Sequence, residues 1–381
     1  MRRLLAVAAV LGCVSLCARP AVAQEPSTWE YSYSPYGYYS SVDGWWLAGY
    51  FRYYSRIGFR ERPEPYRAAF TLTGGASTRG SYLVDLDAQA PALWDGWRAG
   101  VSVTAARANR LGYYGTGNGS TYDADSATAQ APFFYRTSRM SQLVRLTLQR
   151  RVVGPLRALA GATIEHTSYR ELPGDNLFRR DAVAGVVDSA PPSDAAVRGG
   201  LILDSRDNEL DPHAGVYVEA LYASGKHYTR TTVNAQGYVH PLERLMFAAR
   251  VAGEKMTGTP GLSLQQSIED AGRPFIAVGG YRSLRGYCDS RFTGPGKLIG
   301  GVEARWAVFW APSLIELKLV AFYDVGRVFA PGEKVRLTSA GLHKSGGGEV
   351  MARLGRNTIL VFGAGFGSDG GQFLFGTTWS Y

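Results

Sequence analysis

The residues with the clearest capacity for specific chemistry surround one arginine. Arg285 follows the pair Gly279-Gly280 and precedes a further glycine, so the backbone on both sides of it can turn tightly. Two carboxylates, Glu303 and Asp324, come later in the chain. A guanidinium can bridge two carboxylates through charge-assisted, partly bidentate hydrogen bonds. The residues alone leave open whether Arg285 forms this bridge or is a solvated loop cation.

Both carboxylates belong to segments in which apolar and polar residues alternate. In 298–310, Val302 and Ala304 share one face and Glu303 lies on the other. In 314–328, Tyr323 lies on the apolar face and Asp324 on the opposite one. Alternation of this kind is typical of β-strands. We therefore expect both carboxylates on the polar face of neighbouring strands.

Period-two alternation recurs along most of the chain and predicts an all-β protein. Sixteen candidate strands follow from it. They are 29–40, 45–55, 66–74, 80–90, 97–107, 140–152, 156–167, 196–204, 214–224, 230–240, 244–255, 298–310, 314–328, 347–356, 358–366 and 371–381, with the region 24–65 the hardest to delimit.

A soluble sandwich and a membrane barrel could both produce this alternation. Strands of about ten residues suit a tilted membrane-spanning strand. The polar faces carry charges, which suits a wet interior, and short and long connections are expected to alternate strictly. The short turns then fall on the periplasmic side and the long connections (108–139, 168–195, 256–297 and 329–346) outside. The sequence predicts a 16-stranded antiparallel transmembrane β-barrel of the outer membrane, with a long loop folded inward.

The first residues are typical of an export signal. Arg2 and Arg3 precede a short apolar run, and Ala21-Val22-Ala23 resembles a cleavage site. Residues 1–23 are therefore predicted to be a Sec signal peptide, with 24–381 as the barrel domain. A lipoprotein signal ending before Cys13 is the alternative.

Composition excludes several other classes. Outside the signal only Cys288 remains, so no internal disulfide can form, and the 5 His lack metal-ligand spacing. The formal charge of +9 comes from Lys and Arg spread singly along strands, without a basic stripe. Basic residues that face a polar lumen or anionic lipid headgroups explain that charge better than nucleic acid does. The expected partners are outer-membrane lipids, namely lipopolysaccharide and phospholipid. We expect no metal and no cofactor.

Four segments in order resemble the BamA/TamA-type insertases and two-partner secretion transporters, the bacterial surface antigen superfamily. Their [VL]RG[FY] signature is matched by Leu284-Arg285-Gly286-Tyr287. The remaining matches are Leu203-Asp204-Ser205-Arg206-Asp207-Asn208 with Pro212 and Gly215, then Gly300-Gly301-Val302-Glu303, and then Phe322-Tyr323-Asp324-Val325-Gly326-Arg327-Val328. The end of the chain, Gly376-x-x-Trp379-x-Tyr381, is similar to the signal that marks barrels for insertion, with Leu374 where a polar residue is usual.

The resemblance implies that Arg285 is held inside the barrel by Glu303 and Asp324. It implies a structural turn at Asp204–Gly215, for which we expect no chemistry. The family's periplasmic POTRA modules have no room in this chain before the strand at 66, so we expect a barrel-only member. Substrate recognition by such modules is then in doubt, and a periplasmic partner protein is one way to supply it.

Two functions remain open at this stage. The first, implied by the resemblance, is assembly of outer-membrane proteins or transport of polypeptides through an openable seam between the first and last strands. The second is a passive channel or structural barrel. An enzyme is not expected, because Ser283 has no evident histidine partner and His166, His227 and His343 lie in or near outer loops.

Overall fold

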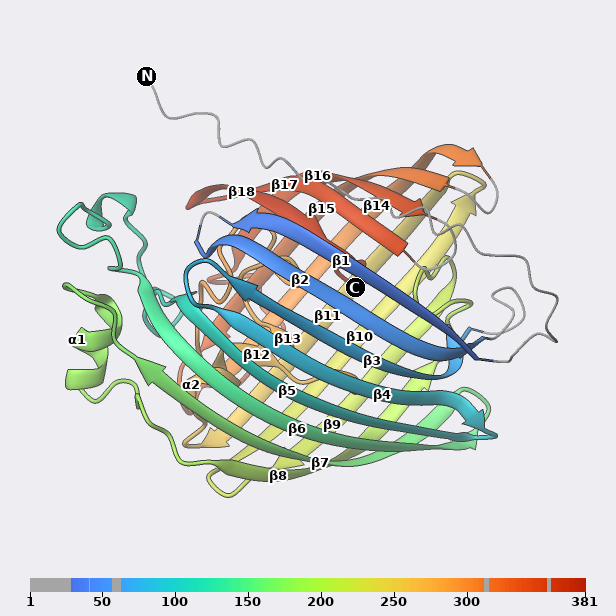
Figure 1. The fold of residues 1–381 in the computed structure, drawn as a ribbon, viewed down its shortest axis with the longest axis horizontal. Helices are drawn as coiled ribbons and strands as arrows, with labels where there is room; N and C mark the ends of the chain where they lie inside the picture. Colours follow the sequence, from blue (N-terminus) through green and yellow to red (C-terminus); the bar gives the residue numbers. More distant parts are fainter. Residues whose placement is uncertain (1–28, 41, 57–62, 312–314, 355–357) are drawn as a thin grey trace.

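Sixteen strands pair in chain order into one antiparallel sheet in the computed structural model, which describes residues 29–40, 42–56, 63–311, 315–354 and 358–381. Figure 1 shows the sheet curling into a barrel from blue β1 to red β18. A second, two-stranded sheet of β12 (Ser267–Ile268) and β13 (Phe275–Ile276) belongs to a loop rather than to the wall. The predicted all-β, sixteen-stranded architecture is confirmed.

The strands of the wall have the following bounds: β1 Trp29–Ser40, β2 Gly44–Arg56, β3 Tyr66–Ser77, β4 Tyr82–Trp94, β5 Trp97–Gly112, β6 Arg136–Val153, β7 Leu156–Arg170, β8 Asp194–Asp204, β9 Gly215–Ser224, β10 Tyr228–Leu242, β11 Leu245–Gly258, β14 Gly296–Ala311, β15 Ile315–Phe329, β16 His343–Leu354, β17 Thr358–Gly367 and β18 Gly370–Gly376. The short helices are η1 Ala124–Ser126, α1 Leu177–Val183 and α2 Leu262–Gln265. None of the helices among the described residues is long and apolar enough to span a membrane.

The barrel is apolar outside and polar inside. Val144, Leu146 and Leu148 of β6 are exposed, whereas Arg145 on the alternate face is buried. The same inversion recurs in β10 and β11, where outward valines alternate with buried polar groups. An exposed apolar face is unfavourable in water and favourable against lipid hydrocarbon, so this distribution is that of a membrane barrel.

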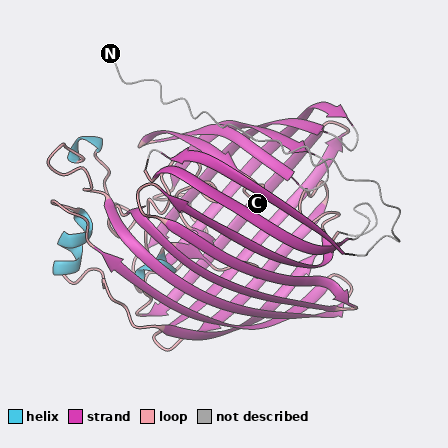
Figure 2. Cartoon of the chain, viewed as in Figure 1, coloured by secondary structure: helices cyan, strands magenta, loops and turns pink. Residues whose placement is uncertain are grey.

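The connections alternate less strictly than the sequence predicted. The four long connections, between β5 and β6, β7 and β8, β11 and β14, and β15 and β16, do lie at one end, where Figure 2 shows the helices. The same end also has short hairpins, because β3 is followed by β4 after 78–81 and β17 by β18 after 368–369. Tight turns at Gly80 and Gly370, both with positive φ, explain these short connections.

The predicted strand 371–381 is too long. Pairing of β18 with β17 ends at Gly376, and residues 377–381 leave the sheet. Phe373 stays outside and is 96% exposed, but Trp379 and Tyr381 are 6% and 7% exposed. Trp379 and Tyr381 therefore do not share the outer face of Phe373, because polar partners in the lumen, the interior of the barrel, bind them.

The sheet is not closed. Along the described residues β1 pairs only with β2, and β18 pairs only with β17. Pro35 lies within β1, and proline is tolerated in a strand mainly where one edge lacks a partner. Along the described residues, each end strand of the sheet therefore has one edge that no other strand pairs with.

Candidate functional site

The loop between β11 and β14, residues 259–295, lies inside the barrel and contributes most of an apolar cluster there (Figure 1). Buried side chains of this loop, including Ile268, Phe275 and Leu284, pack against one another and against Ile299 of β14 and Val328 of β15. A long connection with its own apolar cluster can hold a fixed conformation inside a polar barrel, because the cluster removes apolar surface from water. This loop positions Arg285.

Two glycines shape the turn before the arginine. Gly279 and Gly280 have φ values of 129° and 98°, a region that side chains rarely adopt. The backbone N–H of Gly280 donates to the carbonyl oxygens of Leu284 (3.2 Å) and Tyr287 (3.1 Å). The turn thereby closes on itself and points Arg285 at the barrel wall.

The guanidinium of Arg285 binds the two carboxylates that the sequence singled out. Its Nε and Nη2 each donate to one oxygen of Asp324, both at 2.8 Å, and Nη1 donates to Glu303 Oε1 at 2.6 Å. The bidentate pair is the strongest geometry for arginine and carboxylate. Arg285 is only 1% exposed, so solvent does not weaken these interactions.

A third acid and an aromatic ring complete the arginine site, which we define as Arg285 with Asp324, Glu303 and Glu349. Glu349 of β16 lies 3.5 Å from Nη1, and the Phe322 ring lies 3.7 Å from the guanidinium carbon. Burial alone would lower the pKa of Arg285, but Glu303 and Asp324 raise that pKa well above its ordinary value. The side chain is therefore held as a cation.

The neighbours of Arg285 in the signature also meet the wall. Leu284 is fully buried, and Gly326 of β15 makes room for it, since a Cβ there would lie 2.5 Å from Leu284 Cδ1. A Cβ on Gly286 would lie 2.6 Å from the Phe366 carbonyl oxygen. The Tyr287 hydroxyl donates to the Lys344 carbonyl oxygen at 3.2 Å. These contacts bring the signature against β15, β16 and β17.

A second ionic cluster holds the other side of the same loop. The Glu269 carboxylate pairs with Arg145 of β6, with Arg198 of β8 at 3.3 Å and with Arg230 of β10 at 3.4 Å. The backbone N–H of Glu269 donates to Glu254 of β11 at 2.8 Å. We call these five residues the Glu269 site.

The loop also reaches a third part of the wall. Arg273 pairs with Asp85 (2.8 Å) and Asp87 (2.9 Å) of β4. Together with the arginine site and the Glu269 site, this contact ties the loop to strands on opposite sides of the barrel. The loop therefore crosses the lumen, and we expect it to obstruct passage through the barrel.

The turn between β8 and β9 is built as a brace. Asp204 accepts from Arg206 at 2.9 Å through each oxygen and pairs with Arg157 at 3.0 Å. Asp207 Oδ1 accepts from the backbone N–H of residues 213 and 214. Gly215 has φ of 103°, and Pro212 beside it is buried. These contacts connect the two ends of the turn and join it to β7.

One residue of this turn has contacts that the sequence did not indicate. Asp211 is buried, accepts from Lys318 of β15 at 3.1 Å and accepts from Trp379 Nε1 at 2.9 Å. Glu349 and Glu269 were missed as well. Parity along 347–356 places Glu349 on the inner face, so strand alternation could have found it. Nothing local marks Asp211 or Glu269, whose partners lie far away in the sequence.

Among the described residues, neither Ser283 nor Ser193 belongs to a complete Ser-His-carboxylate triad. Ser283, which the sequence left without a partner, accepts from the N–H of Gly279 at 3.0 Å. Ser193 lies 2.9 Å from His166 Nδ1 in an exposed position, and no carboxylate among the described residues bonds the other ring nitrogen. No group of three or more His, Cys, Asp or Glu in the described ranges could hold a metal ion.

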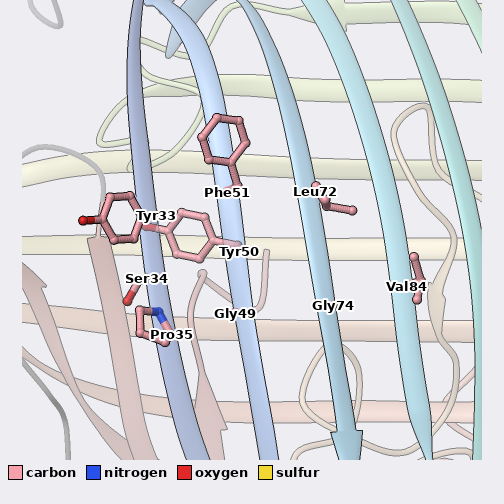
Figure 3. Close-up of a pocket in the computed structure, with 9 residues that line it drawn as sticks. All are labelled: Tyr33, Ser34, Pro35, Gly49, Tyr50, Phe51, Leu72, Gly74 and Val84. Carbon is pink, nitrogen blue, oxygen red and sulfur yellow. The ribbon is translucent and has the colours of Figure 1, made fainter.

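The outer face beside the free edge of β1 carries a recess of about 560 Å³. Gly49 and Gly74 contribute no side chains to its floor, and Tyr33, Phe51 and Leu72 stand around it (Figure 3). A Cβ added at Gly74 would meet no atom within 4 Å. The recess is an apolar surface that opens toward lipid.

A sixteen-stranded sheet with an apolar exterior and an arginine-anchored loop in its lumen defines an outer-membrane β-barrel. The Omp85 superfamily domain matches residues 67–367, and the chain belongs to this superfamily. Members of this superfamily are bacterial outer-membrane proteins that include insertase-like and translocator-like barrels.

Two solved structures share the fold. BamA from Haemophilus ducreyi lacking POTRA domains 1–3 is similar with a TM-score of 0.56 and 15% identity, over 92% of this chain and 70% of that one. CdiB from Escherichia coli has a TM-score of 0.57 and 12% identity, over 92% of this chain and 60% of that one. The comparison with curated protein sequences finds no match. At these identities the likeness concerns the fold.

Proposed function

We propose that this barrel takes part in the assembly of outer-membrane proteins or in the transport of polypeptides at the outer membrane. The observation that carries the proposal is a sheet whose two end strands, β1 and β18, each pair with only one neighbouring strand along the described residues. A free edge presents unpaired backbone N–H and C=O groups, which an incoming strand can pair with. Membership in the Omp85 superfamily supports the same role.

The blocked lumen favours this role over that of a passive channel. The loop 259–295 is tied to β4 through Arg273, to β6, β8 and β10 through Glu269, and to β14 and β15 through Arg285. A permanently open pore needs a continuous aqueous path, and we expect these contacts to obstruct it. The remaining route for a polypeptide is the edge of the sheet. This role requires no catalysis, and a periplasmic partner protein could deliver the client.

The recess on the outer face adds to the proposal. Tyr33 lies on the edge strand β1, and the floor at Gly49 lies on the adjacent strand. A strand added to β1 would place its lipid-facing side chains beside this apolar surface. Outer-membrane lipids would cover the recess when no client is present.

Reconstitution into lipid vesicles tests the proposed function. An unfolded outer-membrane barrel protein is added, and its conversion to a heat-modifiable, protease-protected form is followed over time. We expect vesicles that contain this protein to accelerate the conversion relative to empty vesicles and relative to vesicles with an unrelated barrel. Ion flux without such acceleration would instead support the passive channel.

A further inference from the structure

The last five residues form a short segment, 377–381, whose end packs against the inner face of the barrel wall. Thr377 and Thr378 are exposed, whereas Trp379, Ser380 and Tyr381 are buried. The boundary is abrupt, because burial begins one residue after an exposed threonine. The three buried residues therefore occupy a defined place.

The indole of Trp379 sits in a polar pocket. The guanidinium carbon of Arg305 lies 3.6 Å from the ring centroid, and the Lys318 ammonium lies 5.5 Å away. The indole N–H donates to Asp211 Oδ1 at 2.9 Å. Burial opposes ionisation of Asp211, but Lys318 and His213 lower the pKa of this carboxyl below its ordinary value. Two cations over the ring and one carboxylate at its edge match the charge distribution of indole.

The residues beside Trp379 are held as tightly. The Arg250 guanidinium carbon lies 4.6 Å from the Tyr381 ring centroid, and Arg305 donates to the Tyr381 backbone oxygen at 3.2 Å. From the lumen loop, the Tyr281 hydroxyl donates to the Thr378 carbonyl oxygen at 2.7 Å. Wall and loop together therefore make one site for the segment.

One carboxylate joins this site to the arginine site. Glu303 Oε1 accepts from Arg285 Nη1 at 2.6 Å and from the Ser380 hydroxyl at 2.9 Å. Glu303 Oε2 accepts from Arg305 at 2.7 Å. Any movement of the 377–381 segment thus changes the hydrogen bonds of the residue that holds the loop.

The sequence of segment 377–381 also fits a continuation of strand β18 in the sheet. The register pairs Gly376 with Val361, so continued pairing would set Thr378 opposite Ile359. Alternation would then put Trp379 and Tyr381 on the lipid-facing side with Phe373, where aromatic residues are favourable near the membrane surface. The alternation of residues 371–381 is compatible with a longer strand, but the contacts of Trp379, Ser380 and Tyr381 hold these residues in the lumen.

We propose that the pocket lined by Arg305, Lys318, Asp211 and Arg250 is a binding site for an aromatic peptide segment. The chain's own Trp379-Ser380-Tyr381 fills this site reversibly, and Glu303 transmits its occupancy to the lumen loop. The ligand class is a short extended peptide with an aromatic residue, a small polar residue and a second aromatic residue. This site exists whether or not the barrel transports polypeptides.

Thiol accessibility tests whether the site is occupied in solution. In a Cys288→Ser background, Ser380→Cys is compared with Thr377→Cys, which lies three residues away and is exposed. With the folded barrel in detergent, a bulky maleimide should label position 380 about tenfold more slowly than position 377, because labelling needs local opening. Equal rates at the two positions would overturn the occupancy of the site.

The coupling through Glu303 is measured at the native Cys288, which belongs to the lumen loop and is partly exposed. Trp379→Ala should accelerate labelling of Cys288, and the control Trp306→Ala, at an exposed position on the outer face, should not. Unchanged labelling in a folded, heat-modifiable Trp379→Ala barrel would refute the coupling. If that variant does not fold, Trp379→Phe, which keeps a ring and removes only the N–H donor, takes its place.

A peptide added in trans tests the ligand class. A barrel that lacks 377–381 is refolded and given the peptide Thr-Thr-Trp-Ser-Tyr. The peptide should restore slow labelling of Cys288, and a peptide with alanine in place of tryptophan should not. Equal restoration by both peptides, or by neither, would show that the pocket does not recognise this ligand class.

Discussion

At the scale of single residues, the main feature of the arginine site is one buried cation in contact with three carboxylates. Arg285 balances Asp324, Glu303 and Glu349, none of which has appreciable solvent contact. Buried charges of this kind add little net stability when paired, but they become costly when a partner is removed. The arginine site is therefore best understood as a specific fixing point for the loop.

Replacement of Arg285 tests this interpretation. Arg285→Ala removes the cation that pairs with buried Asp324 and Glu349, and we expect a loss of about 3–5 kcal/mol in the free energy of unfolding. The free energy of unfolding of Arg285→Lys should lie between those of the unaltered barrel and Arg285→Ala. The ammonium keeps the positive charge but cannot reproduce the bidentate contact with Asp324. The measurement is the loss of heat-modifiable migration with rising temperature or denaturant.

A matched surface arginine serves as the control. Arg151 pairs with Asp95 at 3.0 Å, but their side chains are 54% and 94% exposed. Arg151→Ala should change the free energy of unfolding by about 0–1 kcal/mol. Equal effects at positions 285 and 151 would contradict the buried arginine site.

The glycine of the signature offers a second test at this scale. A Cβ on Gly286 would lie 2.6 Å from a backbone oxygen of β17, so Gly286→Ala must displace the loop. We expect a destabilisation of roughly 1–3 kcal/mol, as for other overpacked sites. Gly237→Ala is the control, because its Cβ meets nothing within 4 Å. Denaturant titration of both variants measures the difference, and a neutral Gly286→Ala would rule out the close approach.

The sequence could indicate Arg285, Glu303 and Asp324 together because strand parity places both acids on the inner face. Proximity of the arginine to those acids came from the resemblance, since a loop side chain has no parity. The structure shows the bidentate contact and adds Glu349. The number of acids that one guanidinium reaches depends on the curvature of the sheet. Alternation shows only the face on which a residue lies, so it cannot predict this number.

At the scale of elements, the loop 259–295 behaves as one body with several attachments. The arginine site and the Glu269 site lie on different parts of the wall, and the apolar cluster of the loop lies between them. If the arginine site is lost, the Glu269 site still holds the loop, and the reverse is also true. The loop should therefore open only when both sites are weakened.

Proteolysis of the loop tests the role of the Glu269 site. Glu269→Gln removes the charge shared by three arginines, and trypsin should cleave the loop about tenfold faster because local opening becomes easier. Glu171→Gln is the control, since Glu171 forms an exposed pair with Arg179 at 2.6 Å. Cleavage sites are read by mass spectrometry. Equal cleavage in both variants would show that the Glu269 site does not hold the loop.

Most strands could be predicted because alternation is a local pattern, and their pairing in chain order follows from antiparallel hairpins. The end of β18 could not. Alternation continues through Tyr381, yet the strand stops at Gly376 because Asp211, Arg305 and Glu303 bind the residues that follow. Those partners lie in another turn and on another strand, so no pattern within residues 371–381 predicts these contacts.

At the scale of the whole molecule, a loop tied across the lumen is combined with two end strands that, along the described residues, pair with one neighbour each. The loop reaches β4, β6, β8, β10, β14 and β15, and β1 and β18 do not pair with each other along the described residues. Such a barrel restricts passage through its centre and leaves its sheet available for β-pairing. The proposed function follows from this combination.

Electrical recording tests the blocked lumen. In planar bilayers the barrel should show little steady conductance, and the double variant Arg285→Ala with Glu269→Ala should show sustained openings. The single variants should lie between, because each leaves one attachment in place. A large, steady conductance of the unaltered barrel would contradict the blocked lumen and favour a passive channel.

The central claim is that the free edges between β1 and β18 carry the function. In a Cys288→Ser background, cysteines at Tyr33 of β1 and Phe373 of β18 are joined by a cleavable cross-linker, and the vesicle assay follows assembly of the client barrel. Cysteines at Ala235 and Val251, already paired between β10 and β11, provide the control. We predict that the β1–β18 cross-link stops the acceleration, that cleavage restores it and that the control cross-link has no effect. Undiminished acceleration with β1 and β18 joined would contradict the account.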